Sequence, residues 1–190
     1  MEKEPYILIL YYSRTGSVRN LAEAIADGVE QVKGIHAKLR TVPSLNGSQP
    51  EGDPLVELDD LRHAAGLAVG SPTRYGNMAA PMKSFIDDTT ELWMSGALVD
   101  KPAAVFTSTS SLHGGQESTL LSMMLPLLHH GMCLLGIPYT EADVSSTHTG
   151  GSPYGATHIA FDNKTALSDE EKRLAVALGK RLAKTALKLR

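Results

Sequence analysis

Short apolar runs alternate with helical patterns along the whole of this chain. The apolar runs cover about residues 6–12, 35–42, 66–70, 103–107 and 133–137. Between the first two runs, Val18, Leu21 and Ile25 recur three and four positions apart, which is the spacing of one helix face. Strands that are separated by helices form a parallel sheet with helices on both faces. We therefore expect an α/β fold, doubly wound around five parallel strands.

The same patterns place the helices and the loops. We expect helices over about residues 18–33, 55–63, 81–86, 116–130 and 168–190. Ser168 and Glu171 have the spacing of a capping box at the start of the last helix. Residues 43–54 are expected to form a polar loop, and residues 138–164 an irregular stretch. With 190 residues, the chain is expected to be a single domain.

Composition excludes several classes of function. The formal charge of −3 gives no general attraction to nucleic acid or anionic lipid, and no apolar run is long enough to span a bilayer. The single cysteine, Cys133, excludes an intrachain disulfide and a Cys-cluster metal site. Because it lies in an apolar run, we expect a buried, inert thiol. With no signal-peptide pattern at the start, these features favour a cytoplasmic protein that neither binds nucleic acid nor inserts into a membrane.

Three of the expected strands end in segments rich in Ser, Thr and Gly. These segments are residues 13–18, 71–77 and 107–115. In open parallel sheets, ligands bind at the carboxyl ends of the strands, where the strand order reverses. The three segments therefore predict a ligand site at this edge of the sheet.

The first of these segments predicts a phosphate site. Ser13, Thr15 and Ser17 supply hydroxyl donors, and the start of the following helix adds free amides and the positive end of its dipole. The segment lacks the Gly-Lys-Ser/Thr of a P-loop and has Gly16 alone where a dinucleotide fingerprint needs three glycines. A single phosphomonoester fits these residues better than a pyrophosphate. The alternative is a turn whose hydroxyls only cap the helix.

Several motifs resemble one known family, the WrbA family of flavodoxin-like NAD(P)H:quinone oxidoreductases. The resemblance extends from Tyr6 to the final helix. It rests on the loop 13–18 and on the motifs Pro72-Thr73-Arg74-Tyr75-Gly76-Asn77-Met78, Gly114-Gly115-Gln116-Glu117, His129-His130-Gly131-Met132 and Gly150-Gly151-Ser152-Pro153-Tyr154-Gly155-Ala156. It implies a flavodoxin-like sheet with strand order 2-1-3-4-5, insertions near residues 87–101 and 138–165, and a homotetramer with active sites near subunit boundaries.

The resemblance also implies the site residues. The phosphate of FMN would be bound by Ser13, Arg14, Thr15, Gly16, Ser17 and Val18. The flavin ring would be lined by Pro72, Thr73, Arg74, Tyr75, Gly76 and Asn77. The pyrimidine and ribityl side would be bound by Ser108, Thr109, Ser110, Ser111, Leu112, His113 and Gly114, and His129 would contact the flavin. Thr15 and Trp93 would face the substrate, and no metal and no catalytic acid or base is implied.

Each of these assignments has a plainer alternative. Arg14 would be a solvated surface residue, His129 a helix-terminal histidine favoured by the dipole, and Trp93 an anchor of the core or of an interface. The sequence also departs from the family in two places. Thr15 stands where some members have an aromatic residue near the nicotinamide, and the loop 108–114 is longer and poorer in glycine than in some members.

The activity that the resemblance implies is two-electron reduction of a quinone. NADH or NADPH would reduce FMN and leave, and a quinone would take the same place, which implies ping-pong kinetics. A flavodoxin-type electron shuttle, an FMN-dependent azo- or nitroreductase, and a scaffold without flavin remain alternatives. The modest net charge argues against a shuttle, because shuttles tend to be strongly acidic.

Overall fold

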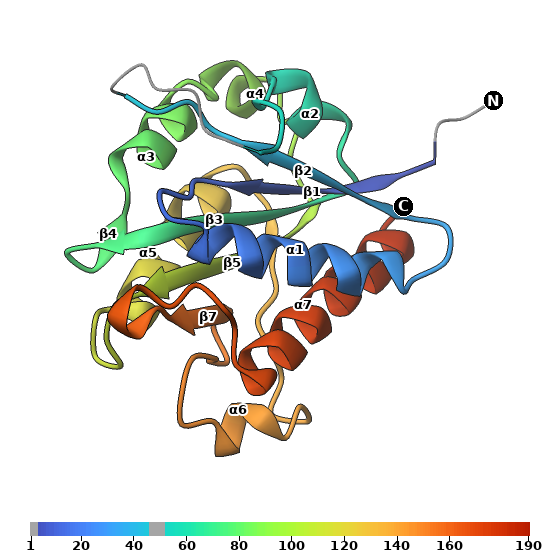
Figure 1. The fold of residues 1–190 in the computed structure, drawn as a ribbon. Helices are drawn as coiled ribbons and strands as arrows, with labels where there is room; N and C mark the ends of the chain where they lie inside the picture. The colour runs from blue at the N-terminus through green and yellow to red at the C-terminus, as the bar shows by residue number, and fades with distance from the viewer. Residues whose placement is uncertain (1–3, 46–51) are drawn as a thin grey trace.

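The computed structural model describes residues 4–45 and 52–190 and forms a parallel sheet covered by helices on both faces (Figure 1). The elements are β1 (Tyr6–Tyr11), α1 (Ser17–Glu30), β2 (His36–Thr41), α2 (Leu58–His63), β3 (Gly66–Arg74), β4 (Asn77–Met78), α3 (Ala80–Asp87), α4 (Thr90–Met94), β5 (Pro102–Thr109), α5 (Gln116–His129), β6 (Cys133–Leu134), α6 (Asp143–Ser146), β7 (Ala156–Ile159), the 3-10 turn η1 (Phe161–Asn163) and α7 (Asp169–Lys188).

The strand order of the sheet is β2-β1-β3-β5-β6, with each neighbouring pair parallel. In the chain order of these five strands this is 2-1-3-4-5, so the expected flavodoxin-like order is confirmed. β1, β3 and β5 are adjacent, and their carboxyl ends therefore meet at one edge. This edge, which we call the carboxyl edge, lies at the left of Figure 1.

The two faces of the sheet carry separate hydrophobic cores. Side chains alternate along β1, so Ile7 and Ile9 pack under α1 and α7, while Leu8 and Leu10 pack on the opposite face. The second core is completed by apolar residues of α2, α3, α4 and α5. A strand that is apolar at every position is therefore explained by helices on both sides.

Two glycines bring α1 and α7 into close contact. A Cβ atom at Gly28 would lie 2.2 Å from the carbonyl oxygen of Val176, and one at Gly179 would lie 2.1 Å from that of Ile25. Each helix therefore presents a glycine to the backbone of the other. No larger residue fits at either position without moving a helix axis.

The expectation for residues 133–164 was partly wrong. The expected fifth strand over 133–137 is reduced to β6, which pairs with the amino half of β5 at Pro102 and Ala103. The stretch 138–164, expected to be irregular, contains α6 and also β7, which pairs with the carboxyl half of β5 from Phe106 to Thr109. The fifth position of the sheet is thus shared by two short strands.

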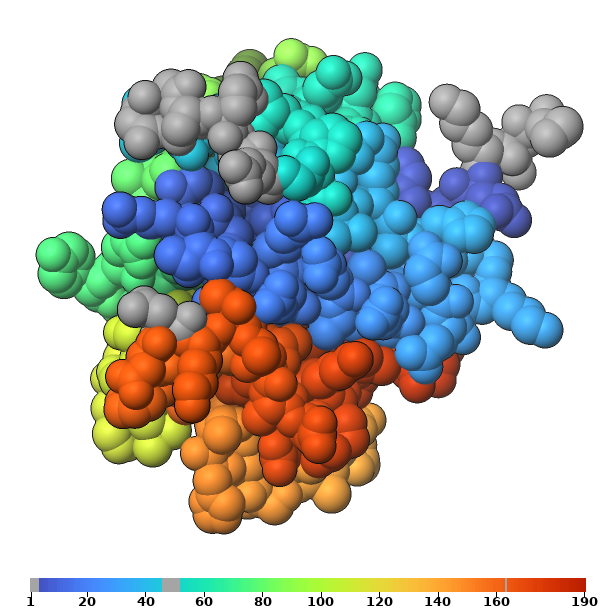
Figure 2. All heavy atoms as spheres, viewed as in Figure 1, coloured from blue at the N-terminus to red at the C-terminus, as the bar shows by residue number. Residues whose placement is uncertain are grey.

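Residues 135–155 leave the sheet after β6 and return to it at β7. This excursion is fixed to α7, because Arg173 Nε and Nη2 donate to the two carboxylate oxygens of Asp143 at 2.7 and 3.0 Å. It projects at the base of the molecule in Figure 2, in light orange. The insertion expected near residues 138–165 falls in this segment and stays a prediction.

Other expectations have mixed outcomes. The helices expected from residue 18, from Pro81, over 116–130 and at the C-terminus are confirmed within a few residues, as is the capping box of Ser168 and Glu171. Cys133 is exposed, so the expectation of a buried thiol was wrong. Most of the loop expected over 43–54 lies outside the described residues. No described helix is long and apolar enough to cross a membrane.

Candidate active site

The loop between β1 and α1 presents main-chain amides at the carboxyl edge. Gly16 has φ of 97°, a left-handed conformation that favours glycine, and it turns the chain into α1. Ser13 Oγ accepts a hydrogen bond from the amide of Gly16 at 3.1 Å, which shapes the loop. The first turn of α1 contains no acidic residue and no side-chain cap. Its amides are therefore available to an anion.

Ser17, the first residue of α1, indicates most directly that this loop binds a ligand. Ser17 is 5% exposed, and its buried Oγ has no hydrogen-bond partner among the described residues. A buried hydroxyl without a partner is destabilising unless a ligand or water supplies one. Because it lies at a helix N-terminus, the ligand that fits it best is an anion such as phosphate.

A second segment, far away in sequence, completes this loop. Asn20 in the first turn of α1 donates from Nδ2 to the carbonyl oxygen of Thr165 at 2.7 Å. A Cβ atom at Gly16 would lie 3.9 Å from Thr165 Cγ2. The orange chain between β7 and α7 accordingly lies directly against the blue start of α1 (Figure 2). Sequence reasoning missed this contact, because no local pattern links α1 to the entry of α7.

The segment after β3 forms a hairpin, where a ligand-lining loop was expected. Thr73 pairs with Met78, and Arg74 pairs with Asn77. Tyr75 and Gly76 form the turn, both at positive φ (53° and 77°), as in a type I′ hairpin. The Tyr75 ring is fully exposed at the tip, so within one chain it contacts no other part of the site.

Hydroxyl groups fix this hairpin to β5 and α5. Thr73 Oγ1 lies 3.0 Å from Thr119 Oγ1 and 3.3 Å from Thr107 Oγ1. Thr107 Oγ1 donates to the carbonyl oxygen of Ser71 at 2.6 Å, and Ser71 Oγ accepts from the amide of Ala79 at 2.8 Å. These hydroxyls are already hydrogen-bonded within the protein. They hold the hairpin in place, and the amides and arginine of the hairpin remain available to a ligand.

The segment after β5 is a tight turn that faces the hairpin. Ser108 and Thr109 belong to β5 and are buried, whereas residues 110–113 are exposed. Thr109 Oγ1 donates to the carbonyl oxygen of Ser111 at 2.8 Å, and the Gly114 amide donates to the same oxygen at 3.1 Å. A Cβ atom at Gly115 would lie 3.0 Å from Gly76 Cα. The tip of the hairpin therefore rests against the start of α5.

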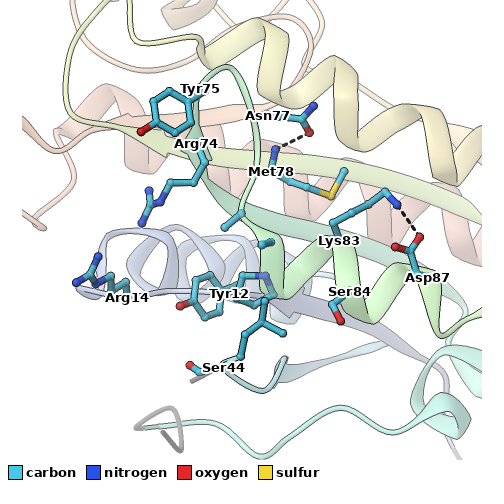
Figure 3. A pocket seen from close by; sticks show the side chains of 14 residues that line it. Tyr12, Arg14, Ser44, Arg74, Tyr75, Asn77, Met78, Lys83, Ser84 and Asp87 are labelled. Carbon is cyan, nitrogen blue, oxygen red and sulfur yellow. Dashed lines mark hydrogen bonds and ion pairs between the residues drawn. The ribbon is translucent and has the colours of Figure 1, made fainter. Parts of the chain in front are cut away.

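A groove of about 1030 Å³ opens between the first loop, the hairpin and α3 (Figure 3). Tyr12 lies at its floor, and Arg14 and Arg74 border it from the first loop and from the hairpin. Lys83 of α3 also borders it but is paired with Asp87 at 2.6 Å. Arg74 donates to the Thr73 carbonyl, and neither arginine has a carboxylate partner among the described residues. The groove therefore offers two guanidinium groups to an anionic ligand.

His129 and Trp93 lie at the other edge of the sheet. His129 ends α5, and the next turn packs against the residues before β5, because the Asp100 amide donates to the Gly131 carbonyl at 3.0 Å. Both side chains border a separate hollow of about 360 Å³ between α4 and α5. Within one chain, this hollow and the first loop lie at opposite edges of the sheet. The expectation that they join the other site residues is not met inside a single chain.

The histidine next to His129 has a structural role. His130 is buried, and Thr89 Oγ1, which donates to the Ile86 carbonyl at 2.6 Å, lies 2.9 Å from His130 Nε2. Burial, with a smaller effect from His129, lowers the pKa of His130. A neutral ring with hydrogen on Nε2 satisfies this geometry. His130 therefore fixes the turn that holds His129 exposed.

Comparison with known proteins identifies the family of this chain. The profile of the family described as NADPH-dependent FMN reductase matches residues 6–142. This chain belongs to that family. Proteins named NAD(P)H dehydrogenase (quinone) from Solidesulfovibrio magneticus and Syntrophobacter fumaroxidans are each 42% identical to it, over 97% and 96% of this chain and 98% of each relative.

Solved structures support the fold. A flavodoxin described as a WrbA-like protein from Agrobacterium tumefaciens has a TM-score of 0.75 at 22% identity, covering 98% of this chain and 99% of that one. A flavodoxin from the domain Archaea has a TM-score of 0.66 at 22% identity, covering 96% and 99%. The resemblance to the WrbA family is confirmed by these findings together.

The residues present fit a flavin cofactor of this family. The unpartnered Ser17 hydroxyl and the free amides of α1 suit its phosphate. The glycines at 76, 114 and 115 have no side chains, so a ligand can approach the backbone of two loops closely.

Tyr11, at the end of β1, donates to Asp53 Oδ2 at 2.6 Å. Burial and Asp53 raise the pKa of Tyr11, so this hydroxyl stays protonated at neutral pH. It does not serve as an acid or base beside the cofactor.

Proposed function

We propose that this chain is an FMN-dependent NAD(P)H:quinone oxidoreductase, which reduces quinones to hydroquinones by two-electron transfer. The observation that carries the proposal is the unpartnered hydroxyl of Ser17 among the free amides at the start of α1. That site suits one terminal phosphate, and FMN ends in one phosphate. Relatives at 42% identity carry the name NAD(P)H dehydrogenase (quinone).

Each loop then has a separate task. Residues 13–18 bind the phosphate through amides and hydroxyls. The main chain of residues 72–77 and of residues 108–114 borders the flavin ring, and the hydroxyl bonds of Thr73 and Thr107 keep these two segments in register. When bound, FMN supplies the redox chemistry, since it can accept a hydride and pass on two electrons. The protein positions the cofactor and the substrates and determines the environment of the flavin ring.

The groove beside the hairpin suits the phosphates of the reduced nicotinamide dinucleotide. Arg14 and Arg74 border it on two sides, and a guanidinium group can bind phosphate oxygens in pairs. The nicotinamide would then reach the cofactor from the side that the quinone uses later. Use of one place by both substrates in turn gives ping-pong kinetics.

We also propose that the active protein is a homo-oligomer, a tetramer by the resemblance to the WrbA family. Trp93 and His129 lie together at the edge opposite the first loop, so they can reach a cofactor only in another protomer. Trp93, Met94, Leu125 and Leu128 are large apolar side chains exposed near this hollow. An exposed apolar cluster of this kind is typical of an interface. The Trp93 indole would then cover a planar quinone in a neighbouring site.

One experiment tests the function. Purified protein is mixed with FMN and its absorption spectrum is recorded, first alone, then with NADH or NADPH, and then with benzoquinone. We expect flavin bands that bleach with reduced nicotinamide and return with quinone. An electron shuttle would oxidise NADH negligibly without a separate reductase, and a chain that binds no FMN would contradict the proposal. Specificity constants for quinone and azo dye separate quinone reduction from azoreduction.

A further inference from the structure

The interior of the molecule holds a histidine that the proposed reaction does not use. His158 in β7 is 1% exposed. Its Nε2 lies 3.1 Å from the carbonyl oxygen of Lys164, and its Nδ1 lies 2.7 Å from Glu171 Oε2. A carbonyl oxygen can only accept a hydrogen bond, so Nε2 must carry a hydrogen.

Glu171 is an ionised carboxylate. Its Oε1 accepts from the amides of Gly150 and Ile159, and its Oε2 accepts from the amide of Ser168, each at 2.9 Å. Burial raises the pKa of Glu171, but the hydrogen bonds from His158 and from the amides of Ile159 and Ser168 outweigh burial, and the pKa lies below its usual value. The ring of His158 therefore contacts two oxygen atoms, one in the turn after β7 and one in the first turn of α7.

We propose that the buried ring of His158 is a positioning residue for the phosphate loop. It holds the Lys164 carbonyl, and the next residue, Thr165, accepts from Asn20 Nδ2 at 2.7 Å and lies beside Gly16. β7, the entry of α7 and the start of α1 are thus joined through one ring. The proposal rests on the proposed function, because the loop that it positions is the proposed FMN phosphate site.

The test is FMN affinity, measured by quenching of flavin fluorescence at pH 7. We expect His158→Gln to bind FMN up to about tenfold more weakly than the unmodified protein, as when one hydrogen bond that shapes the loop is lost. Asn20→Ala breaks the other link to the same segment, so the double variant should lose little more affinity than either single variant. The matched control is His148→Gln, an exposed histidine in the same excursion, which should behave as the unmodified protein.

Two outcomes overturn the proposal. One is a folded His158→Gln protein, by circular dichroism, with unchanged FMN affinity. The other is a double variant whose loss of FMN affinity equals the full sum of the losses of His158→Gln and Asn20→Ala, because the two residues would then act independently.

The outcomes also separate this inference from the proposed function. If the unmodified protein binds no FMN, the proposed function fails, and amide hydrogen exchange at Gly16 and Ser17 still decides whether His158→Gln loosens the loop. If His158→Gln does not fold, Asn20→Ala decides, and unchanged FMN affinity in that variant contradicts the proposal.

Discussion

At the scale of single residues, the side chain of Ser17 contributes little to stability and is proposed to bind the FMN phosphate directly. Its hydroxyl has no partner among the described residues, so Ser17→Ala removes an unsatisfied group. We expect the free protein to keep or slightly gain stability and FMN affinity to fall by about 1.5–3 kcal/mol, the contribution of one hydrogen bond to a charged group. Thermal unfolding and FMN titration measure the two effects. Ser122→Ala, in the middle of α5, is the control and should leave FMN affinity unchanged.

Replacing the two arginines of the groove should change KM for the reduced nicotinamide but not KM for the quinone. If Arg14 and Arg74 bind dinucleotide phosphates, replacing both by Ala should raise KM for NADH or NADPH by about tenfold, while KM for the quinone changes little. Steady-state kinetics with each substrate varied in turn measures both constants. Arg62→Ala, at the far edge of the molecule, is the control. An equal rise in both constants would argue against this role of the arginines.

Single residues also show which contacts of the site cannot be predicted from the sequence. The phosphate loop follows from local order alone, because a strand, a hydroxyl-rich turn and a helix are consecutive in the chain. Asn20 and Thr165 are 145 positions apart, and only the packing of α1 against α7 brings them together. The fully exposed Tyr75 was assigned to the ring on resemblance, and its positive φ, which turns it outward, has no signal in a single sequence.

At the scale of elements, the entry of α7 depends on the charge of Glu171. The pKa of this carboxylate is lowered in the folded chain, so the stability that it contributes is present above its unfolded value, about pH 4.3. That stability is lost as pH falls through the lower, folded pKa. Glu171→Gln should cost about 1–3 kcal/mol at pH 7, because the amide nitrogen of glutamine cannot accept and leaves a buried donor unpaired. The variant should also lose less stability than the unmodified protein as pH falls below about 4. Urea unfolding between pH 3 and 7 measures both, with the less buried Glu170→Gln as control.

The contact between α1 and α7 predicts a second effect on stability. Gly28→Ala would place a methyl group 2.2 Å from the Val176 carbonyl, so the helices must separate. Alanine has the higher helix propensity, which alone would stabilise the variant by about 1 kcal/mol. We expect overpacking to outweigh it and the free energy of unfolding to fall by about 1–3 kcal/mol. Asp27→Ala, on the exposed face of the same helix, should not lower stability. A more stable Gly28→Ala protein would show that the helices are not in close contact.

The elements themselves were largely predictable because each inner strand is a continuous apolar run. β7 was missed for a physical reason. It consists of Ala156, Thr157, His158 and Ile159, and its two polar side chains are buried only because Gly151, Gln116 and Glu171 supply hydrogen bonds. The hairpin of β3 and β4 was missed because its turn, Tyr75-Gly76, lacks the usual Asn-Gly or Asp-Gly sequence.

At the scale of the whole molecule, the proposed assembly can be tested by mixing defective chains. Ser17→Asp places a negative charge in the phosphate site, and Trp93→Ala removes the indole from the opposite edge. Each variant alone should be inactive or weak. If each site combines a loop from one protomer with a tryptophan from another, random mixed oligomers should regain about a quarter of full activity. Unfolding and refolding the two together, followed by an assay, measures this. If the mixture is no more active than the separate variants, the two residues do not come from different protomers at one site.

The sharing of one sheet position by β6 and β7 has a consequence for how such a chain can change over generations. Each short strand is anchored to its own half of β5, so neither depends on the number of residues that join them. Insertions or deletions between them leave the pairing of the inner strands untouched. The segment between β6 and β7 can therefore change in length and sequence, and acquire new interfaces, without altering the proposed cofactor site at the carboxyl edge.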